Sequence, residues 1–298
     1  MEFYSPLRYP GGKGKLATLL KDVIVENEIN DAIYIEPYAG GAAAALSLLM
    51  EEYVWKIVIN DIDKAVHAFW WCVLNHTEWL LKKIQETSIT MDEWYRQKAI
   101  YETAENHDDK DIGFSAFFLN RTNRSGILKG GVIGGHGQQG KYKLNSRFNK
   151  NDLSKRIKKI ARRKNRIRLF NLDAADLLKQ IGRTLSGAVL FYFDPPYYKK
   201  GCMLYTNHYN HESHFRIAKT IRRLRFPWIV TYDDVPEISK IYKGCASVQF
   251  SLMYTAHLNR AKGTEVMFYS GIELPNYMNL MKLPYFSRDK VIDLGYAK

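Results

Sequence analysis

Cysteine is scarce in this sequence, with three residues in 298, and none of them lies at the spacing of a metal site. Cys72, Cys202 and Cys245 are too far apart for the close pairs that bind zinc, and an odd number supports no disulfide framework. The eight histidines are also scattered, without cysteines or carboxylates at ligand spacing. We therefore expect no bound metal and a reducing, cytoplasmic location.

Long apolar runs are missing too. No run approaches the roughly 20 residues that cross a bilayer, and the amino-terminal MEFYSPLRYPGGKGK lacks the apolar centre of a signal peptide. The sequence thus predicts no membrane association.

Positively charged side chains, in contrast, are abundant. The 44 Lys and Arg residues against 31 Asp and Glu give a formal net charge of +13, which favours a polyanionic partner.

Seven short apolar runs, bounded by polar residues, glycine or proline, predict seven β-strands. Helix-like segments separate most of them, and this alternation predicts an α/β fold with a mostly parallel sheet between helices. The strands are expected at 32–37, 56–61, 166–173, 188–196, 227–234, 246–252 and 265–271. The helices between them are expected at 41–52, 62–84, 174–181 and 211–224.

Residues 86–150 interrupt this alternation and predict a subdomain inserted into a core made of 1–85 and 151–298. The insertion begins with an expected helix over 91–104 and ends in a segment rich in Gly, Asn, Arg and Lys. Such side chains suit phosphate and base-edge contacts, so we interpret it as a nucleic-acid recognition region, with a flexible surface insertion as the alternative. The run SKRIKKIARRKNRIR that follows predicts a basic helix over 152–168, with one buried face and phosphate contacts.

The first expected strand leads into EPYAGGAAAAL, which resembles a nucleotide-binding turn. Glu36 precedes a tight Gly40–Gly41 turn, and a helix of small residues lets the backbone approach a nucleoside closely, although close helix–sheet packing explains the pattern equally well. The second strand ends at Asp61, whose carboxylate can accept hydrogen bonds from both hydroxyls of a ribose. Two acids at this edge favour a nucleoside without a polyphosphate, such as S-adenosylmethionine.

The apolar run AVLFYF ends in DPPY, where one carboxylate is followed by two prolines. Because proline donates no hydrogen bond to a sheet, the strand stops at Asp194, at the ligand-binding end of the sheet. A site that accepts both hydrogens of an exocyclic amine, through the Asp194 carboxylate and the Pro195 carbonyl, favours a pyramidal nitrogen that can attack a methyl group. Pro196 holds this turn rigid, and Tyr197 is a candidate to stack on an extruded base.

Three segments in this order, LRYPGGKGKL, EPYAGGAAAAL and DPPY, resemble the Dam-type D12 class of DNA adenine-N6 methyltransferases. The resemblance covers nearly the whole chain, since FFLNRTNRSG and GKYKLNSRFNK are also similar to segments of that family. It implies a class I methyltransferase core with a seven-stranded Rossmann-like sheet, and S-adenosylmethionine as cofactor. The implied reaction is site-specific methylation of N6 of a flipped adenine in double-stranded DNA. A monomer suffices to flip one base, and a cognate restriction endonuclease is a candidate partner.

The resemblance also implies roles for the residues that match the family's motifs. Asp173 meets the adenine of the cofactor, with Asp176 as the alternative, and Ala42 stands where the family often has glycine. Lys13 meets the methionine carboxylate of the cofactor. The cofactor-binding positions are Tyr9, Lys13, Glu36, Pro37, Gly40, Asp61, Asp173 and Asp194. The candidate DNA contacts are Arg8, Arg121, Arg124, Lys129, Lys141 and Arg147.

Two other functions fit the same residues. One is adenine-N6 methylation of structured RNA, and the other is a DNA-binding homologue that has lost catalysis. Asp at position 194 favours adenine N6 over cytosine N4 or protein glutamine in the terms of this family, and no cysteine follows a proline as C5 methylation of cytosine requires. His257 and Arg260, in a polar loop between the last two expected strands, are candidates for lining the target pocket.

Overall fold

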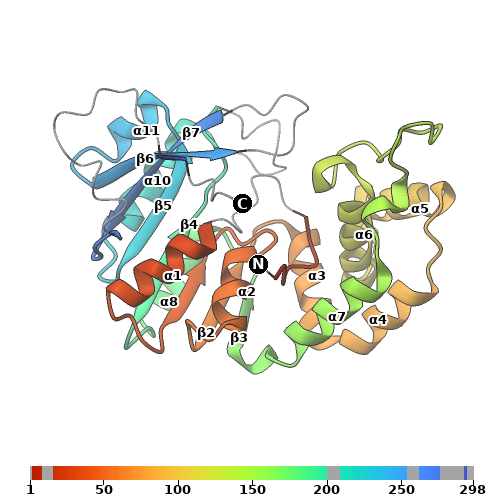
Figure 1. Ribbon diagram of the computed structural model, residues 1–298, viewed down its shortest axis with the longest axis horizontal. Helices are drawn as coiled ribbons and strands as arrows, with labels where there is room; N and C mark the ends of the chain where they lie inside the picture. Colours follow the sequence, from red (N-terminus) through yellow and green to blue (C-terminus); the bar gives the residue numbers. More distant parts are fainter. Residues whose placement is uncertain (1, 9–15, 200–208, 254–261, 276–291, 294–298) are drawn as a thin grey trace.

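The computed structural model describes residues 2–8, 16–199, 209–253, 262–275 and 292–293, and its centre is one mixed β-sheet (Figure 1). The order of its eight strands is β3-β2-β1-β4-β5-β7-β6-β8. All seven expected strands are present, and the predicted α/β fold is confirmed. The strands are β1 (Ile33–Glu36), β2 (Lys56–Asn60), β3 (Ile167–Phe170), β4 (Val189–Phe193), β5 (Trp228–Asp233), β6 (Ala246–Met253), β7 (Lys262–Ser270) and the short β8 (Ile292–Asp293).

The strand order reverses between β1 and β4, and this reversal places the ligand-binding edge. From β1 the chain moves to β2 and β3 on one side, and it then returns to β4 and β5 on the other, with all these pairings parallel. In open α/β sheets, ligands bind outside the carboxyl ends of the strands at such a reversal. β7 is antiparallel to β5, with Asp233 opposite Glu265, so the amino-terminal half of β7 reaches the same edge.

Helices cover both faces of the sheet, and alternate strand residues point to opposite faces. In β4, Leu190 and Tyr192 belong to the hydrophobic cluster that includes α1–α3, whereas Phe191 and Phe193 belong to the cluster that includes α8, α10 and α11. Among the described helices none is long and apolar enough to cross a membrane. The helices on the sheet are α1 (Leu16–Glu26), α2 (Ala43–Met50), α3 (Lys64–Asn75), α8 (Ala174–Gly182), α10 (His211–Ile221) and α11 (Pro236–Ile241).

The helix expected over 62–84 is in fact two helices, α3 and α4 (Thr77–Glu86). The break falls at His76, whose φ of −130° and ψ of 39° are not helical. The Thr77 hydroxyl donates to the Val73 carbonyl at 2.8 Å, so a side chain satisfies an acceptor at the end of α3 and the chain can turn. Apolar periodicity alone does not reveal such a break.

The insertion consists mainly of α5 (Met91–Glu102) and α6 (Asp109–Thr122), and it packs against the core through α3 (Figure 1). A Cβ atom at Gly113 of α6 would lie 2.6 Å from the Ala68 carbonyl oxygen of α3, so only glycine permits this close crossing. Trp94, Phe114 and Phe117 of the insertion share one hydrophobic cluster with α1–α3. The division into a core and a recognition subdomain stays a prediction. The two parts pack against each other through this common hydrophobic cluster.

The basic run forms a shorter helix than predicted. α7 (Lys150–Ala161) is followed by a 3-10 turn and then by β3, so the expected helix over 152–168 is wrong beyond Ala161. Arg166 donates to the carbonyls of Val54 and Trp55, directly before β2 begins. The carboxyl-terminal part of the basic run therefore lies at the amino ends of the strands, opposite the predicted ligand edge.

Candidate active site

Acidic side chains follow the carboxyl ends of four adjacent parallel strands. Glu36 ends β1, Asp61 directly follows β2, and Asp194 directly follows β4. Asp173 lies three residues after β3 and begins α8. Because these strands are neighbours in the sheet, the four acids predicted from sequence come to one edge. The negative charge of Asp194 even contributes to the raised pKa of Glu36.

Asp61 is buried and receives two main-chain donors. Gly40 N–H donates to Oδ2 at 2.9 Å, and Asp63 N–H donates to Oδ1 at 2.9 Å. Burial, and then the charge of Asp63, raise the pKa of Asp61 to about 7. Each carboxylate oxygen still has a lone pair for another donor, so the group can accept two hydroxyls of one ligand.

Asn60, directly before Asp61, is a structural centre that we did not predict. Its side-chain amide donates to the carbonyls of Pro37 at 2.8 Å and Leu172 at 2.9 Å, and its oxygen accepts the Leu172 N–H at 2.9 Å. One buried amide thus joins the loops that follow β1 and β3. An asparagine at a strand end usually indicates a turn. The sequence has no pattern that would distinguish such a turn residue from one whose side chain joins two loops.

Glu36 holds the amino end of α2 and is itself almost fully buried. Its Oε1 accepts the Tyr34 hydroxyl at 2.8 Å and the Ala45 N–H at 3.1 Å. Burial outweighs these hydrogen bonds and raises the pKa of Glu36 to about 8. Ala42, at the N-cap of α2, has a φ of 47°. This left-handed conformation suits glycine better than alanine.

We expect Glu36→Gln to reduce the fall in the free energy of unfolding between about pH 4.5 and 8 that burial of Glu36 should cause. Between the ordinary value of 4.5 and about 8, the folded protein keeps a proton on Glu36 that the unfolded chain releases. The free energy of unfolding therefore falls as pH rises through this window, by up to about 1.4 kcal/mol per pH unit. Urea unfolding of both proteins at pH 5, 7 and 9 measures the difference. Curves that stay parallel across these pH values would contradict the assignment.

The loop after β4 is held by side chains from β5. The Thr231 hydroxyl donates to Oδ1 of Asp194 at 3.3 Å, and it also lies 2.8 Å from the Tyr192 hydroxyl. Further along the loop, the N–H groups of Tyr198 and Lys199 donate to the two carboxylate oxygens of Asp233, at 2.8 and 3.1 Å. Pro195 and Pro196 are buried between these two anchors. The half-buried Asp194 carboxylate therefore sits on a fixed turn.

Tyr197 is also held, through its side chain. It is 7% exposed, and its hydroxyl donates to Oε1 of Glu265 in β7 at 2.7 Å. Glu265 is 1% exposed. The two residues are 68 positions apart, and the sequence contains no signal for their contact. The stacking role predicted for Tyr197 stays a prediction.

The structure separates the two candidates for the cofactor adenine. Asp173 caps α8, accepting the Ala175 N–H at 2.9 Å, and its other oxygen lies 3.5 Å from the Tyr209 hydroxyl. Tyr209 is in turn 3.0 Å from the hydroxyl of Tyr38 in the loop after β1. Asp176, in contrast, is exposed and paired with Lys179. Asp173 is therefore the acid that borders the cofactor loop, and its role stays a prediction.

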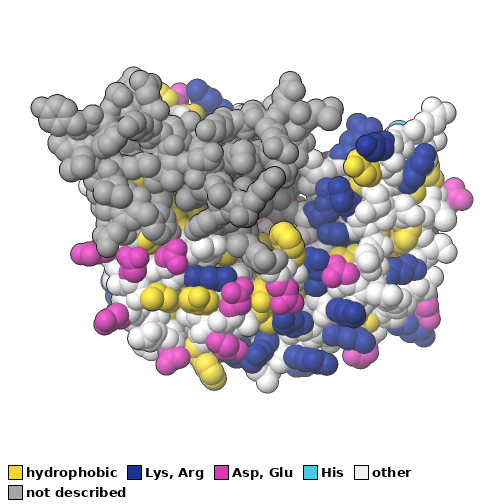
Figure 2. Space-filling model, in the orientation of Figure 1, with side chains coloured by type: hydrophobic (Ala, Val, Ile, Leu, Met, Phe, Trp, Pro, Cys, Tyr) yellow, Lys and Arg dark blue, Asp and Glu magenta, His cyan; other side chains and the backbone are white. Residues whose placement is uncertain are grey.

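The candidate DNA contacts fall into two groups. Arg124, Lys129, Lys141 and Arg147 are exposed on the insertion. Figure 2 shows that Lys and Arg side chains gather on this part of the molecule. Arg8 and Arg121 are half-buried instead and donate to main-chain carbonyls.

Asn120 joins the amino-terminal segment to the insertion. Its side chain accepts the Arg8 N–H at 2.7 Å and donates to the carbonyls of Arg8 at 2.6 Å and Gly126 at 2.9 Å. Gly126 has a φ of 76°, and a Cβ atom there would lie 2.4 Å from the Arg8 carbonyl oxygen. The stretch FFLNRTNRSG therefore docks the segment before PGGK onto the insertion.

Four predicted residues lie outside the part of the chain that the structure describes. They are Tyr9, Lys13, His257 and Arg260. Within the described residues, no three His, Cys, Asp or Glu side chains gather as a metal site.

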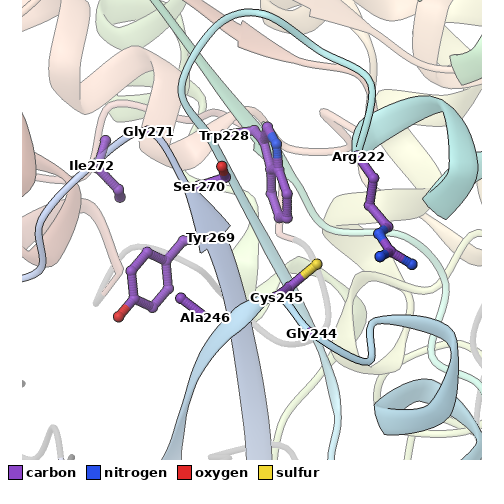
Figure 3. Close-up of a pocket in the computed structure, with 9 residues that line it drawn as sticks. All are labelled: Arg222, Trp228, Gly244, Cys245, Ala246, Tyr269, Ser270, Gly271 and Ile272. Atoms are coloured by element: carbon purple, nitrogen blue, oxygen red, sulfur yellow. The ribbon is translucent and has the colours of Figure 1, made fainter.

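A cavity of about 320 Å³ lies at the opposite edge of the sheet (Figure 3). Trp228 begins β5, Ala246 begins β6 and Ser270 ends β7, so the cavity is at the amino end of β5. Arg222 at its wall donates to the carbonyls of Ile241 and Lys243. The cavity lies at the opposite end of the strands from Asp194, and we do not assign it to the active site.

Comparisons with known proteins point in one direction. A family model described as D12 class N6 adenine-specific DNA methyltransferase matches residues 9–259. A comparison with curated proteins gave no match.

Solved structures with a similar fold include an S-adenosylmethionine-dependent methyltransferase from Agrobacterium tumefaciens, at 9% identity and a TM-score of 0.41. This alignment covers 86% of the present chain and 61% of that protein, so the chain spans less than two thirds of its length. The rRNA methyltransferase AviRa from Streptomyces viridochromogenes is similar at 10% identity and a TM-score of 0.40, with 88% and 85% of the two chains covered.

Proposed function

Because the chain belongs to the D12 class of N6 adenine-specific DNA methyltransferases, we propose that it transfers the methyl group of S-adenosylmethionine to N6 of an adenine flipped out of duplex DNA. The observation that carries the proposal is the position of Asp194. This carboxylate follows β4, directly beside β1 and its Glu36–Gly40 loop, at the reversal of strand order. The acceptor proposed for the target base and the proposed cofactor loop would then lie side by side at one edge of the sheet.

The acids at this edge fit the cofactor. When bound, S-adenosylmethionine supplies an electrophilic methyl group on a positively charged sulfur. Asp61 suits a ligand without phosphates, because its carboxylate has acceptor capacity for both ribose hydroxyls. Ile62, 44% exposed next to Asp61, offers an apolar face for the adenine ring. Asp173 would accept a hydrogen bond from the adenine amino group.

Asp194 and the Pro195 carbonyl would act on the target base. The N6 lone pair of adenine is delocalised into the ring, so the nitrogen is a weak nucleophile. Two fixed acceptors for its hydrogens favour the pyramidal form, and the Asp194 carboxylate stabilises the positive charge that develops on nitrogen during attack. Thr231 and Asp233 hold the turn before the base arrives, so little reorganisation is required.

A cluster of arginines supports a nucleic acid as the substrate. Arg121 lies among the guanidinium groups of Arg8, Arg147 and Arg156, with Asp152 as the neighbouring acid that offsets them. Burial, and then the charges of Arg8 and Arg156, lower the pKa of Arg121 to about 9, so it remains charged at neutral pH. Such a concentration of positive charge is costly by itself, and a phosphate group of the DNA backbone would relieve the repulsion.

We expect Lys129→Gln and Lys141→Gln to weaken DNA binding by reducing counterion release. Each variant should lower the slope of log affinity against log salt concentration by about 1, if each lysine contacts one phosphate. Lys164→Gln is the matched control, because this exposed lysine precedes β3 at the opposite edge. Fluorescence anisotropy of a labelled DNA duplex at several salt concentrations measures the slopes. An equal change in the control would contradict the placement of DNA on the insertion.

Competition between duplex DNA and RNA tests the proposed substrate. The protein is incubated with tritiated S-adenosylmethionine and equal concentrations of unmethylated duplex DNA and structured RNA, and label in each is counted. We expect label in DNA alone, whereas label in RNA alone would favour the RNA enzyme. Cofactor and DNA binding without transfer would indicate a silent homologue.

We also propose that the protein acts as a monomer and works in the cytoplasm. A cognate restriction endonuclease is its proposed partner.

A further inference from the structure

Glu265 occupies an unusual place for a carboxylate. It is 1% exposed, in a strand, and its neighbours in the sheet are Asp233 of β5 and Phe250 of β6. Removing a carboxylate from water is costly unless strong hydrogen bonds replace the lost solvation. One such bond comes from the Tyr197 hydroxyl at 2.7 Å, the short distance typical of a hydrogen bond to a charged acceptor.

The antiparallel direction of β7 makes this contact possible. If β7 ran parallel to β5, its amino-terminal half would lie at the far edge of the sheet, away from the loop after β4. In the actual topology Glu265 lies opposite Asp233 in register, so two acids stand side by side under that loop. Asp233 accepts the main-chain N–H groups of Tyr198 and Lys199, whereas Glu265 accepts the side-chain hydroxyl of Tyr197.

We propose that Glu265 is a positioning residue, which fixes the ring of Tyr197 as the surface against which the extruded base stacks. The inference rests on the proposed function, and it adds a residue that is not among the site residues predicted from the sequence. The hydroxyl oxygen of a tyrosine lies on the axis of the second side-chain bond, so its hydrogen bond to a buried acceptor restricts rotation about the first bond and fixes where the ring lies. The close surroundings of this 7% exposed side chain restrict rotation of the ring plane about the second bond. The ring is then in place before the base leaves the duplex, and no ordering cost falls on the reaction itself.

The roles of Glu265 and Asp233 are separable by experiment. Thr231 and Asp233 hold the loop at its two ends, so removal of the Glu265 carboxylate leaves these anchors in place. The expected consequence is a ring that moves more freely on a loop that keeps its course. Methyl transfer should then slow, while S-adenosylmethionine binds as before. Three of the four proposed cofactor acids belong to the ends of β1, β2 and β3, and the fourth, Asp194, keeps its hydrogen bond from Thr231.

A double-mutant cycle on the full chain tests the proposal. The variants are Tyr197→Phe, which removes the hydroxyl and keeps the ring, Glu265→Leu, which removes the acceptor, and the two combined. Glu265→Gln is the conservative variant, because its amide oxygen can still accept the bond. Gln249→Leu on β6 is the matched control, since its side chain bonds Asp234 rather than the loop. Turnover on unmethylated genomic DNA, the cofactor dissociation constant and thermal unfolding are measured for each.

Each single change should lower kcat about tenfold, the loss of one hydrogen bond to a charged group. The double variant should lose no more than either single variant, Glu265→Gln should retain more activity than Glu265→Leu, and cofactor affinity should stay unchanged. Losses that multiply in the double variant, or a Tyr197→Phe protein with full turnover, would overturn the proposal. A wild-type protein that binds cofactor and leaves DNA unmethylated would overturn the proposed function first.

Discussion

Asp194→Ala is expected to reduce kcat for methyl transfer by about 1000-fold or more, while S-adenosylmethionine binding largely survives. In the proposed mechanism the carboxylate provides both the hydrogen-bond acceptor and the negative charge that favour attack by the target nitrogen. Loss of one preorganised group typically costs about 100-fold to 1000-fold, and loss of both contributions together places the effect at or above the upper end of that range. Cofactor binding depends mainly on other acids at the edge. Single-turnover methylation and calorimetric titration of the cofactor separate the two effects.

Two further variants sharpen this result. Asp194→Asn keeps an acceptor oxygen and loses the charge, so its activity should lie between those of the wild type and Asp194→Ala. Thr231→Val removes the hydroxyl that donates to Asp194 at 3.3 Å and should cost about tenfold, because the carboxylate stays in place and loses one hydrogen bond that orients it. The substitution also removes the contact with the Tyr192 hydroxyl at 2.8 Å, so thermal unfolding of the variant is measured alongside. Near-normal turnover by Asp194→Ala would remove Asp194 from the mechanism altogether.

Asp61→Ala is expected to weaken S-adenosylmethionine binding about 100-fold. The substitution removes the proposed acceptor for both ribose hydroxyls, and it also leaves the buried N–H of Gly40 without the oxygen that it bonds at 2.9 Å. Two lost hydrogen bonds to a charged group account for a change of this size. Asp176→Ala is the control, because it removes the same charge from an exposed position paired with Lys179.

The same carboxylate should make cofactor binding depend on pH. The pKa of Asp61 is raised to about 7, so the free protein carries a proton there at lower pH. Accepting both hydroxyls requires the ionised form, and the apparent dissociation constant should therefore rise by up to about tenfold per pH unit as pH falls below about 7. Asp61→Asn has no proton to lose and should show a flat profile between about pH 6 and 8. An equally steep profile in this variant would assign the dependence to another group.

The local pattern of apolar and polar residues was sufficient to predict much of the fold. The strands β1, β2 and β4 are apolar runs that end at Glu36, Asp61 and Asp194, and the position of a strand end depends on the residues of that segment alone. For this reason the acids of the site could be predicted from the amino-acid sequence. The seven strands and their α/β order follow from the same apolar runs.

The supports of the site depend on contacts between distant segments. Asn60 reaches the loops after β1 and β3, and Glu265 reaches Tyr197 only because β7 runs antiparallel. Neither fact is encoded in local spacing. The insertion shows the same limit, because Arg121 and Arg124 belong to one short motif, yet the first donates to main-chain carbonyls and the second is exposed.

The most direct test of the proposed activity is a map of N6-methyladenine. Unmethylated genomic DNA is incubated with S-adenosylmethionine and either the wild-type protein or Asp194→Ala, and single-molecule sequencing locates the modified bases. We expect methylated adenines enriched in one short sequence motif with the wild type, and none with the variant. DNA that stays unmodified by a wild-type protein with demonstrably bound cofactor would contradict the central claim.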